Sequence, residues 1–93
     1  MQAEKIKWLH LGNEIVVNTE EIIGIFDLDN TTVSRHTRDM LSQAQKENRV
    51  ITVSMELPKS FIICRREEDF WVYLSQISPS TLLKRSSSFL RFE

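Results

Sequence analysis

The sequence has little of the residues that build disulfide scaffolds, phosphate-binding loops or membrane spans. Its only cysteine is Cys64, and it has two histidines and two glycines. One thiol cannot form an internal disulfide, and these few ligands do not readily make a structural zinc site. There is no glycine-rich phosphate loop. No stretch approaches the roughly 18 apolar residues of a membrane span, and residues 1–7 lack the apolar run of a secretion signal. We therefore expect a cytoplasmic protein that holds no metal and no cofactor.

An excess of one charge is also missing, since the formal net charge is -1. This excludes a domain that is strongly basic throughout, but it leaves room for a local basic patch. Residues 1–32 carry two lysines against six acids, whereas residues 33–66 carry seven Lys or Arg against three acids. An anion-binding surface is therefore expected in the middle third of the chain.

The periodicity of the apolar residues predicts an α+β fold. Ninety-three residues suit a single domain over 1–93, with a core at about 7–86 and a C-terminal tail at 87–93. Runs typical of strands fall at 7–11, 14–18, 22–27, 50–54, 60–64 and 70–76. The first two runs predict a hairpin, residues 18–21 predict one capped turn, and Gly24 indicates a bulge or a close backbone contact. The polar, capping-prone residues 29–32 mark the start of a helix. Helical spacing predicts a long helix at about 32–48, and Ser78–Pro79 is a typical start for a short one reaching about residue 86. We expect a small, mostly antiparallel sheet of about five or six strands, with the long helix after strand 3 and the short helix at the C-terminus.

The predicted long helix has two distinct faces. One carries the apolar or small residues Val33, Thr37, Met40, Leu41 and Ala44, which are expected to pack on the sheet. The opposite face carries cations that could contact phosphates, and Lys59 in the next loop adds another; these candidates are Arg35, Arg38, Lys46, Arg49 and Lys59. The alternative is an ordinary solvated helix face. In a ring or filament, one weak patch of charge is multiplied by the number of subunits.

The predicted strands carry more apolar surface than one layer of helices covers. Phe61–Cys64 is apolar on both faces, and Trp71 and Tyr73 alternate with apolar residues that face the other way. Because helices can cover one face of a small sheet, we expect the other face to pack against further copies in a ring or dimer. The interface candidates are Phe61, Ile63, Trp71, Tyr73 and Phe89. The alternative is a curled sheet or barrel that buries both faces within one chain.

Signals of catalysis are weak. His10 and His36 are far apart in sequence, and Cys64 lies in an apolar strand typical of a buried, inert thiol. Asp27 and Asp29 have the spacing of the D-x-D loop of phosphatases, but 93 residues leave no room for the rest of that domain. We predict no catalytic residues and a protein that is not an enzyme.

Several short motifs, in this order and spacing, resemble the Rem family of bacterial extracellular matrix (biofilm) regulators, and its B-type member above all. They are Leu9–Gly12, Ile15–Val17, Ile22–Asp27, Pro58–Ile63 and Ser78–Arg85, and the resemblance runs from about Trp8 to Phe92. It implies a cytoplasmic bacterial protein linked to the control of matrix genes. The A-type member of that family is a DNA-binding activator that assembles into rings.

The resemblance does not carry over the DNA contacts of the A-type member. Its DNA-contacting arginines align near Glu21, Glu56 and Leu57, none of which is basic. Acids at such positions repel phosphate, so DNA binding would depend on the helix cations or Lys59. Two functions therefore stay open. One is an oligomeric regulator that binds DNA, and the other is an oligomeric module that binds a protein partner instead.

Overall fold

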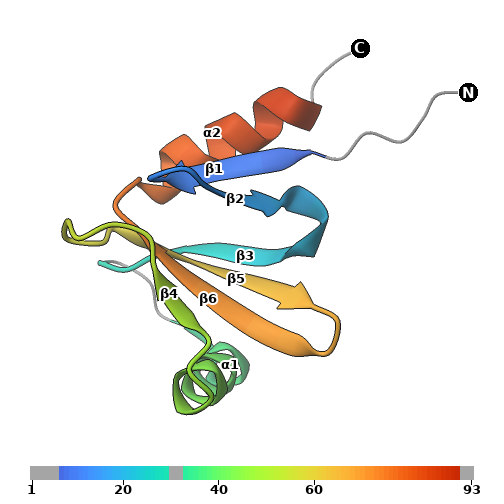
Figure 1. Cartoon of the computed structure of the whole chain (residues 1–93), viewed down its shortest axis with the longest axis vertical. Coiled ribbons are helices and arrows are strands. Elements are labelled where there is room, and N and C mark those ends of the chain that lie inside the picture. The colour runs from blue at the N-terminus through green and yellow to red at the C-terminus, as the bar shows by residue number, and fades with distance from the viewer. Residues whose placement is uncertain (1–6, 30–32, 91–93) are drawn as a thin grey trace, which may run out of the picture.

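The computed structural model describes residues 7–29 and 33–90. These residues form six strands and two α-helices, which confirms the predicted α+β class and the places of both helices in the element order. The strands divide between two sheets, a two-stranded hairpin and a four-stranded sheet. Figure 1 shows three layers, with the hairpin and helix α2 on one side of the larger sheet and helix α1 on the other.

The hairpin consists of β1 (Trp8–Gly12) and β2 (Ile15–Asn18), paired antiparallel. Asn13 and Glu14 form its turn with positive φ angles of 44° and 67°, as tight hairpin turns require. The Asn13 side chain also donates a 3.0 Å hydrogen bond to the carbonyl of Val53, which ties the hairpin tip to the chain after β4. After β2, the Asn18 side chain caps the short 3-10 turn η1 (Thr19–Glu21), as the sequence predicts.

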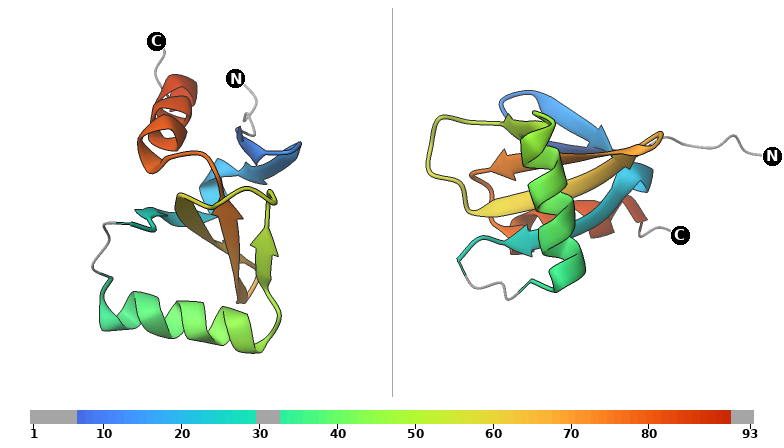
Figure 2. Two further views of the ribbon diagram at one scale, coloured as in Figure 1. Left: turned by 90° about the vertical axis from the view of Figure 1, so that its left-hand side faces the viewer. Right: turned by 90° about the horizontal axis from the view of Figure 1, so that it is seen from below.

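The larger sheet has the strand order β3-β5-β6-β4. β3 (Ile22–Asp27), β5 (Ser60–Arg66) and β6 (Asp69–Ser75) are antiparallel neighbours, whereas β4 (Val50–Thr52) runs parallel to β6. The parallel pair follows from α1, which crosses the sheet between β3 at one edge and β4 at the other (Figure 2). The register of β3 shifts between Ile22 and Gly24, in agreement with the predicted irregularity at this glycine.

Helix α1 (Arg35–Lys46) begins three residues later than predicted because Ser34 caps it. The Ser34 hydroxyl accepts a 3.1 Å hydrogen bond from the backbone N–H of Thr37. The helix ends at Lys46, and Asn48 two residues later has a left-handed φ of 59°. The N–H of Arg49 closes this end on the carbonyl of Ala44 at 2.8 Å. The capping residues expected at 30–32 lie outside the described residues.

Helix α2 (Pro79–Leu90) is longer than predicted. Residues 87–90, expected in a tail, continue the helix, whereas 91–93 lie outside the described residues. Its start agrees with the prediction, since the Ser78 hydroxyl accepts a 3.3 Å hydrogen bond from the N–H of Thr81. Within the described residues, neither helix is long and apolar enough to cross a membrane.

Both faces of the larger sheet are covered within the chain. Alternation along β5 sends Phe61 and Ile63 toward α1, where they pack with Ala44, and sends Ile62 and Cys64 toward the hairpin side. That second core also contains Tyr73 of β6 and Val53 after β4. The hairpin contributes Leu9, Leu11 and Val17 to it, and α2 contributes Leu82. The expectation that one sheet face would need another copy to cover it was therefore wrong, because the hairpin and α2 close that face.

Candidate functional site

The outer face of α1 gathers three of the predicted phosphate-binding residues. Arg35, Arg38 and Lys46 are exposed, whereas Thr37 and Ala44 on the same helix are buried against the sheet. Among residues 7–29 and 33–90, no carboxylate forms an ion pair with any of the three cations. We call these three residues the cationic face. The opposite side of α1 packs on the sheet, which holds the cationic face in a fixed position. Figure 2 shows the whole helix lying along one side of the molecule.

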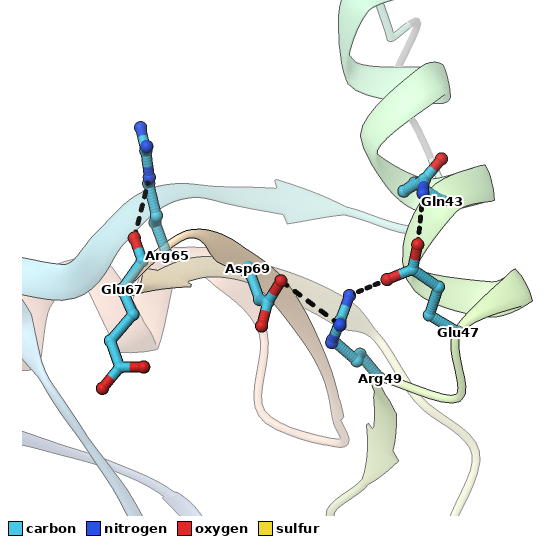
Figure 3. Close-up of polar contacts among 6 residues, drawn as sticks. All are labelled: Gln43, Glu47, Arg49, Arg65, Glu67 and Asp69. Carbon is cyan, nitrogen blue, oxygen red and sulfur yellow. Dashed lines mark hydrogen bonds and ion pairs between the residues drawn. The ribbon is translucent and has the colours of Figure 1, made fainter.

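Arg49 does not belong to the cationic face. It follows α1, and its guanidinium pairs with Glu47 and, at 3.2 Å, with Asp69 at the start of β6 (Figure 3). Gln43 in turn donates a hydrogen bond to Glu47. The charge of Arg49 is therefore balanced by two carboxylates, and its role is to join the end of α1 to the sheet.

Lys59 is exposed at the opposite end of the sheet strands from Arg49. It immediately precedes β5, and its backbone bonds to Leu28 and Ser75. The structure therefore brings three of the five predicted cations together on one helix face and leaves Arg49 and Lys59 outside it.

The predicted interface residues lie mostly inside the chain. Phe61 and Ile63 are buried beneath α1, and Tyr73 is buried on the hairpin side. Trp71 is half-buried, with the guanidinium of Arg66 5.2 Å from its ring centre. The side chain of Phe89 lies outside the described part of the chain. None of these four described side chains provides a freely exposed apolar surface.

The most exposed apolar side chains of the described residues lie elsewhere, in the loop before β5, and a second exposed apolar group lies near the other end of that strand. Before β5, the loop formed by residues 53–59 exposes Met55 by 98% and Leu57 by 83%. Beyond the other end of β5, a solvent-open hollow of about 290 Å³ is lined by Trp8, Val16, Val17, Asn18, Glu21 and Arg66. The sequence does not indicate this hollow, because Trp8 and Arg66 meet only through the docking of the hairpin on the sheet.

Arg66 is the charged group of the hollow. Its Nε lies 3.6 Å from Glu21 Oε1, and its Nη2 donates a hydrogen bond to the Tyr73 hydroxyl, which raises the pKa of Arg66. A guanidinium has five N–H donors, so these two contacts leave donors for a further acceptor. The side chain is 41% exposed, which keeps those donors accessible.

No described residues form a recognisable catalytic group. Cys64 is fully buried, and burial raises its thiol pKa from 9.0 to about 12. Asp27 accepts a 2.8 Å hydrogen bond from the N–H of Asp29, a local turn contact. Within 7–29 and 33–90, no three His, Cys, Asp or Glu residues lie close enough together to hold a metal ion.

Comparison with known proteins gives the family of this small α+β protein. The sequence matches the RemA-like family, described as "Extracellular matrix regulatory protein A-like", over residues 8–85. The chain belongs to this family of regulators. It is 32% identical over 79 residues to extracellular matrix regulatory protein B of Bacillus subtilis (strain 168), and the match covers 85% of this chain and 89% of that protein.

Proposed function

We propose that this protein is a cytoplasmic regulator of matrix gene expression that works as a homo-oligomer and contacts DNA through the cationic face of α1. The observation that carries the proposal is the set of three cations on one helix face, none of them paired with a described carboxylate. Unpaired Arg and Lys side chains are free to neutralise phosphates and release counterions, which is the main source of sequence-independent DNA affinity.

A single copy offers too little charge for tight binding. Its net charge is -1, and Asp39 lies beside Arg35 and Lys46 when the helix is viewed down its axis. Several linked copies would present the cationic face repeatedly, so that later contacts form at a high effective concentration. Assembly and DNA contact therefore belong to one mechanism in this proposal.

The test is fluorescence anisotropy of a labelled duplex titrated with the full chain at several salt concentrations. The logarithm of the affinity should fall by up to about 2.7 per tenfold rise in salt for each engaged subunit, since each neutralised phosphate contributes about 0.9. The triple variant R35A/R38A/K46A should lose most of the affinity and most of the salt slope. Asp39→Asn should tighten binding, because it removes an acid from the edge of the face.

Two matched variants control for loss of charge alone. Arg49→Ala removes a cation that already has two carboxylate partners, and Lys84→Ala removes one on α2, across the sheet from α1. Both should bind DNA nearly as the wild type does. If the triple variant bound duplex as tightly as the wild type, the cationic face would not be the contact surface. If the wild type bound no duplex even at low salt, the alternative of an oligomeric module for a protein partner would replace this function.

A further inference from the structure

Among the described residues, two groups of exposed apolar side chains lie at opposite ends of the same strand, and the other exposed large apolar residues are Ile23, Leu28 and Leu83. β5 begins directly after the loop with Met55 and Leu57, and it ends at Arg66 in the hollow. Its seven residues separate the two features by roughly 20 Å. In Figure 1 the β4–β5 loop is at the left and the β5–β6 turn is at the right. Two surfaces at opposite ends cannot meet within one chain, but they can meet between copies.

The loop is held firmly at both of its ends. The N–H of Val53 donates to the carbonyl of Leu74 at 2.9 Å, and the N–H of Lys59 donates to that of Ser75 at 2.8 Å. Within the loop, the N–H of Glu56 donates to the Ser54 hydroxyl at 3.1 Å. Met55 and Leu57 are thus presented by an ordered loop, which lowers the entropy that binding would cost.

The loop and the hollow both expose apolar side chains, and they carry groups of opposite charge. The loop places the acid Glu56 between two apolar side chains. The hollow places Arg66, already paired with Glu21, beside the exposed apolar side chains of Trp8 and Val16. An acceptor on the loop therefore meets a guanidinium that has spare donors. A hollow of about 290 Å³ is at the lower limit of small-molecule sites. It suits the insertion of side chains better than the binding of a large cofactor.

We propose that the loop of one copy, through Met55, Glu56 and Leu57, docks into the Trp8–Val16–Arg66 hollow of a second copy. The contact is head-to-tail, so it generates a ring or a filament rather than a closed two-fold dimer. This inference rests on the homo-oligomer of the proposed function and assigns its interface. The cationic face of α1 takes no part in the contact, so it stays available in every copy.

The test is sedimentation velocity of the full chain and two variants at one protein concentration. The loop variant M55S/L57S removes the docking side chains but keeps the hollow. The hollow variant Val16→Lys blocks the hollow but keeps the loop. We expect the wild type to sediment as a multimer and each variant alone as a species of 10.9 kDa. Leu83→Ser, at a 52% exposed position on α2, is the control and should assemble as the wild type does.

Mixing the two variants gives the sharpest result. Each variant has one intact surface and one blocked surface, so a head-to-tail contact predicts a complex of two chains and nothing larger. If the wild type assembles and both variants assemble equally well, or if the mixture stays monomeric, the assigned interface is wrong while the oligomer stands. A monomeric wild type overturns the oligomer itself. Circular dichroism of each variant checks that its fold is retained.

Discussion

The substitution Leu82→Ala tests whether α2 and the hairpin close one face of the sheet. Leu82 is fully buried, and it is the only buried residue among the described side chains of α2. It packs in a core that joins the hairpin residue Leu9 and the sheet residue Ile62. If α2 is an integral part of this core, shortening Leu82 leaves a cavity where three elements meet.

The expected cost is large for a chain of this size. Removing a buried leucine side chain costs about 2–5 kcal/mol, and a 93-residue domain has a total stability of about 5–14 kcal/mol at the usual stability per residue. Each kcal/mol lowers the Tm of such a domain by about 4–8 °C. Leu82→Ala should therefore lower the Tm by about 8–40 °C and shift the urea midpoint without changing the slope of the transition.

The neighbouring Leu83 provides a matched control. It undergoes the same change in side-chain chemistry on the same helix, but it is 52% exposed. Leu83→Ala should change the free energy of unfolding by about 0.5 kcal/mol or less. All variants are compared at one protein concentration, because any assembly would make the Tm depend on concentration. Equal losses for the two substitutions would refute the packing of α2 described above.

Three further predictions test particular contacts. Gly24→Ala should cost about 1–3 kcal/mol in urea unfolding, because its Cβ would lie 2.6 Å from the Phe26 ring; an unchanged midpoint would contradict this. Ser75→Ala should cost about 1–3 kcal/mol in thermal unfolding, since it removes the 2.7 Å hydrogen bond to the buried carbonyl of Leu11; a wild-type Tm would contradict this. Cys64 should resist thiol reagents at neutral pH until the protein unfolds, and fast labelling of the folded chain would refute its burial. Because its pKa rises from 9.0 unfolded to about 12 folded, its contribution to stability is full below pH 9 and is lost as the pH rises toward 12.

The parts of the fold that depend on local periodicity could be predicted from the sequence. The hairpin, the irregularity at Gly24 and the apolar stripe of α1 each follow from neighbouring residues, and the structure has all three. The alternation of Phe70, Val72 and Leu74 with Trp71 and Tyr73 along β6 also divides these residues between the two cores as predicted.

The parts that depend on docking could not be predicted in this way. Pairing of Arg49 with Asp69 requires the end of α1 to lie beside β6, and the hollow requires Trp8 to meet Arg66. Sequence spacing carries no information about either approach. The same limit explains the mistaken expectation of an uncovered sheet face. The apolar strands were recognised correctly, but their cover comes from the hairpin and α2 through tertiary packing.

We propose that DNA lies against the cationic face of α1, and lysine footprinting is a direct test of this contact. The protein is acetylated briefly with and without a saturating duplex, and the modification of each lysine is measured by mass spectrometry. Lys46 belongs to the face, whereas Lys84 is exposed on α2 across the sheet. We expect DNA to slow the acetylation of Lys46 and to leave the acetylation of Lys84 unchanged. Protection of Lys84 with Lys46 unprotected, or equal labelling of both with and without DNA, would contradict it.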